Sequence, residues 1–209
     1  MTSPADPSYD VDYPAAPWDM VGQLWLSLFR VREAVDALRP AGVYGVAFVS
    51  YEEGSPLTYS ELLVARPVQE DGLKAVSITD IWVDSPASVA GGRGLWAIPK
   101  ELCDFRLESS YRGPLSRTEW TATAGRRPIA RAEFTDVSRL AVRIPFKGAT
   151  WQPPIDDHTS PVTAALTGSA KALPCRGRWE FAPDGPLGWL ADARQLASFR
   201  QAGFRMSFA

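Results

Sequence analysis

The sequence has little histidine and little cysteine. His158 is the only histidine among 209 residues, and Cys103 and Cys175 are the only cysteines. A single histidine cannot build a multi-histidine metal site, and it weakens the case for a Ser-His-Asp triad. The cysteines lie far apart without a Cys-x-x-Cys spacing, which indicates neither zinc nor a disulfide framework. We therefore expect two reduced thiols, no metal and no cofactor, with His158 in an exposed proline-rich loop.

The sequence also lacks blocks of like charge and long apolar runs. It has 22 basic and 24 acidic residues and a net charge of -2. This balance gives no electrostatic footprint for nucleic acid or for an anionic membrane. No segment is apolar for long enough to span a bilayer, and the N-terminus has no signal-peptide pattern. We expect a soluble, cytoplasmic protein whose partner is a small molecule or another copy of itself.

Lysine is scarce as well, which narrows the search for an amine nucleophile. Of the 22 basic residues, only four are lysines: Lys74, Lys100, Lys147 and Lys171. The others are arginines, which stay charged and cannot act as amine nucleophiles. Lys100 has the most apolar surroundings, because Trp96, Ile98 and Leu102 flank it. The other three lie in turn-like stretches or could face outward from a strand.

Two interpretations of Lys100 are open at this point. If the segment is buried, desolvation disfavours the ammonium and lowers the pKa of Lys100, and a neutral amine can attack a carbonyl. If the segment lies at the surface, Lys100 is a solvated side chain. In either case we expect it at or near a short helical turn that begins at Pro99.

Most of the chain consists of short strand-like segments separated by turns. Segments rich in β-branched and aromatic residues, bounded by glycine, proline and polar residues, predict strands. The predicted strands cover residues 21–29, 43–51, 57–68, 73–83, 103–109, 117–124, 128–136, 139–145, 165–173, 176–183 and 196–208. Many short strands with few helices predict a mainly β fold, a single-domain antiparallel β-barrel.

Two short helices and an N-terminal arm complete this prediction. Residues 32–39 place apolar side chains at helical spacing before a proline. Ser85 and Pro86 fit the N-cap and first position of a second helix, which Gly91 and Gly92 would keep short. Residues 1–18 contain four prolines and predict an extended arm, so the barrel domain would span residues 19–209.

Two segments resemble the acetoacetate decarboxylase family. The first contains Gly92-Arg93 and then Pro99-Lys100, similar to the family's Gly-Arg-Glu, a few apolar residues and Tyr-Pro-Lys-Lys. The second, Tyr59-Ser60-Glu61, resembles the family's Tyr-x-Glu strand and lies at a similar distance from the lysine. The general strand pattern is similar over residues 20–208.

The resemblance implies a β-barrel or cone-like double sheet, a small-molecule carbonyl substrate and a homo-oligomer. It implies that Lys100 is the Schiff-base lysine and that Glu61 is the active-site glutamate, which would shuttle protons. An alternative role for Glu61 is a structural acid paired with Arg93. The candidate substrate-binding residues are Arg93, Tyr59, Trp96 and Glu101.

The chain also departs from the family pattern. Glu101 stands in place of the second lysine, Gly94 in place of the glutamate and Ile98 in place of the tyrosine. A carboxylate at position 101, if close to the amine, would stabilise the ammonium and oppose its activation. The family's N-terminal arginine and further glutamate have no counterpart around residues 22–23 and 44–45. We therefore expect a substrate other than acetoacetate.

Three classes of function remain open. The first is a lyase that acts on a keto acid or related carbonyl compound through a Schiff base on Lys100, by decarboxylation, aldol or dehydration chemistry. The second is a cyclase or isomerase that has kept the barrel without the Schiff base and uses Glu61 as acid or base. The third is a protein that binds a small molecule without turnover.

Overall fold

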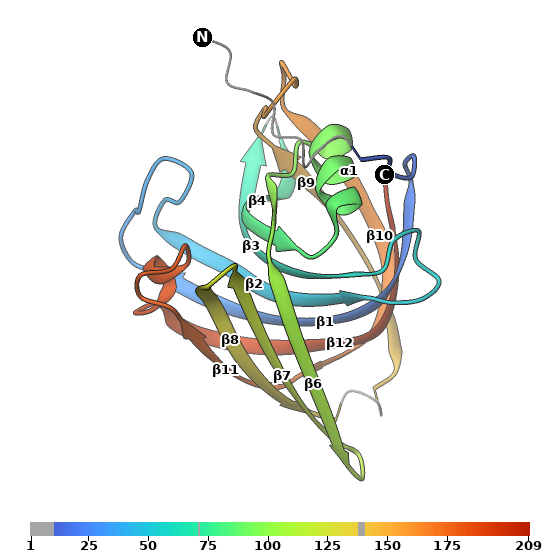
Figure 1. The fold of residues 1–209 in the computed structure, drawn as a ribbon, viewed down its shortest axis with the longest axis vertical. Coiled ribbons are helices and arrows are strands. Elements are labelled where there is room, and N and C mark those ends of the chain that lie inside the picture. The colour runs from blue at the N-terminus through green and yellow to red at the C-terminus, as the bar shows by residue number, and fades with distance from the viewer. Residues whose placement is uncertain (1–10, 71, 138–140) are drawn as a thin grey trace.

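Seven strands of this computed structural model close into a barrel, and an eighth extends the same sheet (Figure 1). The structure describes residues 11–70, 72–137 and 141–209. The order around the barrel is β3-β2-β1-β12-β10-β9-β4, and β4 pairs with β3 to close it. The strands of this sheet are β1 (Trp18–Val31), β2 (Gly42–Tyr51), β3 (Tyr59–Glu70), β4 (Leu73–Val83), β5 (Lys100–Leu102), β9 (Arg143–Gln152), β10 (Val162–Pro174) and β12 (Arg194–Phe208).

The predicted mainly β barrel is confirmed, but two strand pairings are parallel where an antiparallel barrel was predicted. Most neighbours are antiparallel, but β4 pairs in parallel with β5 and, through the single pair Val76 and Thr150, with β9. The parallel β4–β5 pair follows from the chain path, because helix α1 (Pro86–Trp96) connects the two strands and a helical crossover returns the chain in the same direction. The sheet is therefore mixed.

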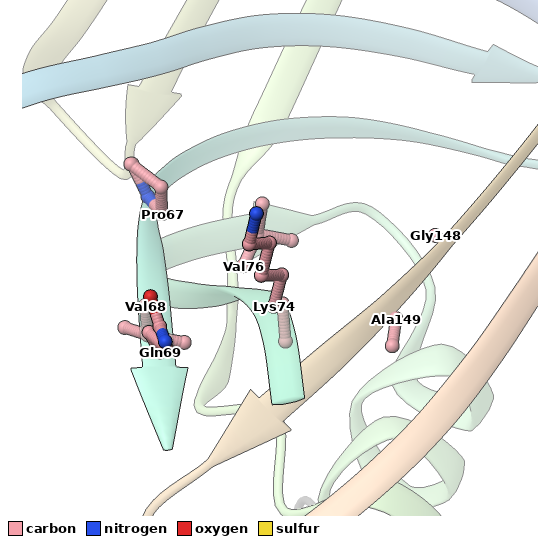
Figure 2. A pocket seen from close by; sticks show the side chains of 8 residues that line it. Pro67, Val68, Gln69, Lys74, Val76, Gly148 and Ala149 are labelled. Atoms are coloured by element: carbon pink, nitrogen blue, oxygen red, sulfur yellow. The ribbon is translucent and has the colours of Figure 1, made fainter. Parts of the chain in front are cut away.

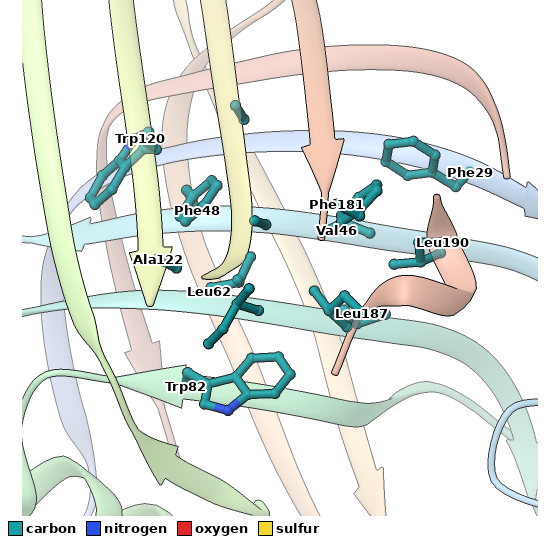
Figure 3. Close-up of a cluster of buried hydrophobic side chains, with 14 of the residues drawn as sticks. Phe29, Val46, Phe48, Leu62, Trp82, Trp120, Ala122, Phe181, Leu187 and Leu190 are labelled. Carbon is teal, nitrogen blue, oxygen red and sulfur yellow. The ribbon is translucent and has the colours of Figure 1, made fainter. Parts of the chain in front are cut away.

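A second antiparallel sheet covers one outer face of the barrel. Its strands are β6 (Asp104–Arg112), β7 (Leu115–Ala124), β8 (Arg127–Asp136) and β11 (Arg176–Phe181), in the order β11-β8-β7-β6. A short 3-10 turn, η3 (Gly188–Leu190), precedes β12. Figure 3 shows the apolar layer between the sheets, where Phe48 stacks on Trp120 at 5.1 Å between ring centroids.

Strand β2 contributes to two cores because both of its faces are buried. Val46 and Phe48 belong to the layer shown in Figure 3, whereas Ala47 and Val49 belong to a second apolar cluster around Lys100. Successive side chains of a strand point to opposite faces, so one strand supplies both clusters. The cluster around Lys100, on the inner face of the barrel wall, is where the candidate site lies.

Helix α1 begins where its sequence predicts and runs through Gly91 and Gly92 to Trp96. The Ser85 side chain accepts a hydrogen bond from the backbone N–H of Ser88, and Pro86 occupies the first turn. The helix stops where Ala97 takes a left-handed conformation with φ 52°. Residues 11–17 have no regular structure and lie against this helix, where Tyr13 approaches Gly94 and Trp18 approaches Gly91.

Two helical predictions are wrong. Residues 32–39 form turns, because the Asp36 carboxylate accepts hydrogen bonds from the backbone N–H groups of Leu38 and Arg39, and Arg39 pairs with Asp80. Lys100 does not lie in a helical turn but begins strand β5, which pairs with Ile81–Val83. The strand predicted over 139–145 is observed as Arg143–Gln152; residues 141 and 142 have no regular structure, and residues 139 and 140 lie outside the described part.

A shallow groove of about 460 Å³ opens at the seam between β3, β4 and β9 (Figure 2). Its wall includes Val68, Lys74 and Val76 on one side and Gly148 and Ala149 on the other. The groove lies where β4 and β9 share only one residue pair, and none of its lining residues belongs to the apolar cluster around Lys100. Among the described residues, no helix is long and apolar enough to cross a membrane.

Candidate active site

Strand β5 positions Lys100 and directs its side chain toward the apolar cluster on the inner face of the barrel wall. Lys100 pairs with Ile81, which belongs to that cluster, and Glu101 pairs with Trp82, which belongs to the layer between the sheets. Lys100 is buried at 4% exposure, whereas Glu101 is exposed. The pleat of one short strand therefore separates the two charged neighbours.

The Lys100 ammonium has three side-chain partners. Its Nζ atom donates to Oε2 of Glu61 at 3.0 Å, to the hydroxyl of Ser88 at 2.9 Å and to the hydroxyl of Tyr59 at 3.2 Å. Glu61 and Tyr59 come from strand β3, and Ser88 comes from the first turn of α1. The structure thus brings together Lys100, Glu61 and Tyr59, three of the residues that the sequence predicts for the site.

Tyr51 completes the polar group at the end of strand β2. Its hydroxyl donates to Oε1 of Glu61 at 3.2 Å, so each oxygen of the carboxylate has a partner. The rings of Tyr51 and Tyr59 lie 4.5 Å apart, as expected for residues that face each other across the β2–β3 pair. Both rings present a hydroxyl to the charged pair and an apolar surface to the cluster.

Gly92 leaves the space that the Lys100 side chain occupies. A Cβ atom at position 92 would lie 2.7 Å from Cδ of Lys100 and 2.8 Å from its Cε. No real Cβ contact is this short, so a larger residue would have to displace the lysine. The glycine pair of α1 therefore has a packing role, with Gly91 against Trp18 and Gly92 against Lys100.

The pKa directions describe a charged pair among neutral hydroxyls. Burial lowers the pKa of Lys100. The carboxylate of Glu61 and the phenol of Tyr59 together raise it by more, so the pKa of Lys100 lies above its ordinary value. Burial also raises the pKa of Tyr59, and that of Tyr51 lies well above its ordinary value. The resting site therefore holds an ammonium and a carboxylate beside two neutral phenols.

The Arg93 side chain contacts the backbone carbonyl oxygen of Lys100. Its Nη1 donates to the carbonyl oxygen of Lys100 at 3.1 Å, and its Nε and Nη2 donate to the Asp156 carboxylate at 2.8 Å each. His158 reinforces this loop, because its half-buried ring places Nε2 2.9 Å from the carbonyl oxygen of Arg93. Arg93 thus ties α1, β5 and the loop after β9 together, and Glu61 pairs with Lys100 instead of Arg93.

Trp96 and Glu101 have their own contacts, and neither is a hydrogen-bond partner of the Lys100 amine. Trp96 packs edge-on between Trp18 and Phe208, with ring centroids 4.9 and 4.6 Å away. The Glu101 carboxylate accepts a hydrogen bond from Nε1 of Trp82 at 3.1 Å, on the opposite face of β5 from Lys100. The carboxylate that stands in place of the family's second lysine therefore does not touch the ammonium.

The sequence did not point to Ser88 or Tyr51. Ser88 lies three residues after the N-cap Ser85, a spacing that places it in the first helical turn above β5. Tyr51 is paired with Tyr59 across a short β2–β3 connection, which is a recoverable signal once the strand register is known. Neither residue carries a motif of its own. Among the described residues, no cluster of His, Cys, Asp or Glu could hold a metal ion.

Comparison with known proteins identifies the family. The family model described as acetoacetate decarboxylase matches residues 31–153, which is more than half of the chain. This chain, with its barrel, second sheet and buried lysine–glutamate pair, therefore belongs to the acetoacetate decarboxylase family. No curated protein matches the sequence.

Solved structures show that the whole fold is shared. An acetoacetate decarboxylase from Legionella pneumophila is 16% identical, with a TM-score of 0.64 over 98% of this chain and 90% of that chain. A second acetoacetate decarboxylase structure is 15% identical, with a TM-score of 0.65 over 99% of this chain and 93% of that chain. The enduracididine biosynthesis enzyme MppR, complexed with pyruvate, is 14% identical, with a TM-score of 0.63 over 99% and 92%.

Proposed function

We propose that this chain is an enzyme that forms a Schiff base between Lys100 and a carbonyl substrate. The observation that supports this most strongly is the contact of 3.0 Å between the Lys100 amine and the Glu61 carboxylate inside an apolar cluster. A buried amine beside a proton acceptor has what a carbonyl nucleophile requires. Membership of the acetoacetate decarboxylase family supports the same chemistry.

The first step is a proton transfer within the pair. Lys100 gives a proton to Glu61, which leaves a neutral amine and a neutral acid, and a bound substrate that excludes water favours this uncharged form. The amine then attacks the carbonyl carbon. The oxygen takes one proton from the attacking nitrogen and a second from Glu61, and it leaves as water. An ammonium and a carbonyl have become an iminium and water, and Glu61 is again a carboxylate beside a cation.

The iminium then accepts an electron pair from the neighbouring carbon. Either a carbon–carbon bond breaks or that carbon gives a proton to Glu61, and in both cases the product is an enamine. Ser88 and Tyr59, each within hydrogen-bond distance of Nζ, hold the nitrogen in place and can donate to the departing oxygen.

The charges near Lys100 favour an uncharged carbonyl substrate. Among the described residues, the buried charged side chains are Glu61, Asp80, Lys100, Asp136 and Arg200. Asp80 pairs with Arg39, and Asp136 lies near Arg200, in both cases outside the cluster around Lys100. Among the described residues, no buried arginine belongs to the cluster around Lys100, so a substrate carboxylate would enter it at a desolvation cost of several kcal/mol. We therefore propose an aldehyde or ketone, and aldol or dehydration chemistry in preference to decarboxylation.

Reductive trapping with a matched pair of probes tests this proposal. Methyl acetoacetate and acetoacetate share one carbon skeleton and differ in the charge of the acid group. With borohydride, the intact mass of the protein is expected to increase with the ester and much less with the acid, and Lys100→Ala should abolish the increase. Absence of an adduct with both probes would rule out the proposed Schiff base. Stronger trapping of the acid would rule out only the proposed preference for uncharged substrates.

A second candidate function follows from the raised pKa of Lys100. An ammonium held by Glu61 can polarise a bound carbonyl without forming a covalent bond, and Glu61 can move a proton in an isomerisation. Glu61→Gln would then abolish turnover, while borohydride would leave activity unchanged in the presence of substrate.

A further inference from the structure

A polar cavity of about 750 Å³ lies between the barrel and the second sheet, apart from the Lys100 site. Residues of β1, β2, β9, β10 and β12 line it from the barrel, and residues of β6, β7 and β8 line it from the second sheet. Neither Lys100 and Glu61 nor their three partners Tyr51, Tyr59 and Ser88 line it. We call it the intersheet cavity; the family chemistry described above makes no use of it.

Arg200 forms the buried wall of the intersheet cavity. Its guanidinium carbon lies 3.6 Å from the ring centroid of Trp25, and its Nη2 donates to Oε1 of Gln23 at 2.6 Å. Its Nε lies 3.7 Å from Oδ2 of Asp136, which is beyond hydrogen-bond distance. The residue is only 8% exposed. Trp25 and Gln23 therefore fix the plane of the guanidinium.

The buried Arg200 guanidinium has N–H groups that make no hydrogen bond within the described part of the chain. Within the described part of the chain, Nε and Nη1 of Arg200 have no hydrogen-bond partner. Buried N–H groups in proteins are nearly always paired, because an unmade hydrogen bond costs the full desolvation of the group. Burial also lowers the pKa of Arg200 to about 10, which leaves the side chain charged at neutral pH. Asp136 lies at ion-pair distance, and the two N–H groups of Arg200 without a hydrogen bond favour a further anionic partner.

Cations outnumber carboxylates around the intersheet cavity. Arg143, Lys171 and Arg200 line it, against the carboxylates of Glu52 and Asp136. The exposed Arg143 guanidinium donates to the carbonyl oxygens of Ser169 and Gly203 and to the Ser169 hydroxyl, which are all neutral acceptors. Among the described lining residues, three basic side chains thus stand against two carboxylates, beside the fixed Trp25 ring.

We propose that the intersheet cavity binds a small molecule through a carboxylate or phosphate group that lies against Arg200 and Arg143. The planar fork of a guanidinium matches both groups, and the Trp25 ring holds the Arg200 fork in place before binding. The hydroxyls of Ser109 and Ser116 on the facing sheet supply further donors. This site lies on the opposite side of the barrel wall from the Lys100 cluster and is independent of the Schiff base.

Calorimetric titration of the full chain at low ionic strength tests the proposal, with inorganic phosphate and succinate as separate probes. Saturable binding of at least one probe is expected, and the two arms tell a phosphate site from a carboxylate site. Arg200→Gln and Ser109→Trp should each weaken binding by about tenfold or more, since the first removes the charge and the second fills the cavity. Lys100→Ala should leave the affinity unchanged.

An exposed arginine supplies the matched control. Arg178→Gln removes the same charge from the second sheet outside the cavity and should not change the affinity. Absence of saturable binding with both probes overturns the proposal. So does equal weakening by Arg178→Gln, loss of binding in Lys100→Ala, or full binding in Ser109→Trp. Because Ser109→Trp keeps Arg200 beside Asp136, it decides the matter even if Arg200→Gln does not fold.

Discussion

Lys100 and Glu61 form a buried ion pair, with 3.0 Å between Nζ and Oε2 and at most 5% of either side chain exposed. A charged pair in this setting exists because each charge offsets the desolvation of the other. The same closeness lets one proton pass between them, which turns a stable resting pair into a nucleophile and an acid. The pair therefore links the stability of the barrel to its proposed chemistry.

Removing the carboxylate should lower the pKa of Lys100. In Glu61→Gln, burial acts on the amine without the opposing charge, so the amine becomes neutral at lower pH. We expect the pH midpoint of Lys100 acylation by acetic anhydride to move down and the free energy of unfolding to fall by about 3–5 kcal/mol. Glu119→Gln, which removes a half-exposed partner of Arg131, is the control and should change neither value by a comparable amount. An unchanged midpoint in Glu61→Gln would contradict the assignment.

A methyl group at position 92 should displace the reactive amine. Gly92→Ala places a Cβ 2.7 Å from Cδ of Lys100, and overpacking of this kind costs about 1–3 kcal/mol, partly offset by the better helix propensity of alanine. We expect borohydride trapping to be lost in a protein that still folds. Gly42→Ala, whose Cβ would meet no atom within 4 Å, should keep full trapping. Equal trapping in both variants would show that the Lys100 position does not matter.

Two serines of α1 should separate stability from reactivity. Ser85 caps the helix, so Ser85→Ala should cost about 1 kcal/mol of stability with little effect on trapping once folded. Ser88 contacts the amine at 2.9 Å, so Ser88→Ala should slow trapping about tenfold or more. Urea unfolding and trapping rates on the same samples compare the two effects. The same loss of rate in both variants would assign Ser88 a structural role only.

Restoring the family's lysine at position 101 should have little effect on the amine. The Glu101 side chain lies on the opposite face of β5 and accepts a hydrogen bond from Trp82. In Glu101→Lys we therefore expect an unchanged pH profile of Lys100 acylation and a loss of about 1 kcal/mol of stability from the lost hydrogen bond. A clear downward shift of the midpoint would show that residue 101 does act on the amine.

The two free cysteines should make the fold less stable at alkaline pH. Burial raises the pKa of both Cys103 and Cys175 from 9.0 to about 12. The unfolded chain loses these protons near pH 9 while the native chain keeps them, so the free energy of unfolding should fall as pH rises from 9 to 12. Urea unfolding at pH 8 and pH 10.5 measures this. A Cys103→Ala and Cys175→Ala double variant should lose part of the difference; an unchanged difference would contradict it.

The core of the site was predictable because it rests on residue types with few alternatives. Four lysines in the whole chain, and the apolar residues around one of them, singled out Lys100, and the resemblance added Glu61 and Tyr59. Side-chain direction was harder to predict. Lys100 and Glu101 are adjacent in sequence, and only their place on a strand shows that they face opposite sides.

The wrong helical predictions have physical causes that act beyond the local pattern. Residues 32–39 have helical spacing, but Asp36 bonds to the backbone of its own turn and Arg39 reaches across to Asp80 on β4. Strand β5 is three residues long and exists through its parallel pairing with β4, a contact across a helix that no local window contains. The strands themselves, with longer β-branched and aromatic segments, were largely predictable.

Site-resolved mapping of the reduced adduct tests the proposed chemistry most directly. The protein is treated with methyl acetoacetate and borohydride and then digested, and the mass of each lysine-containing peptide is measured by mass spectrometry. We predict that the adduct lies on Lys100, with little on Lys74, Lys147, Lys171 or the N-terminal amine. An adduct distributed over those other amines, with Lys100 unmodified in an active protein, would contradict a Schiff base at this site.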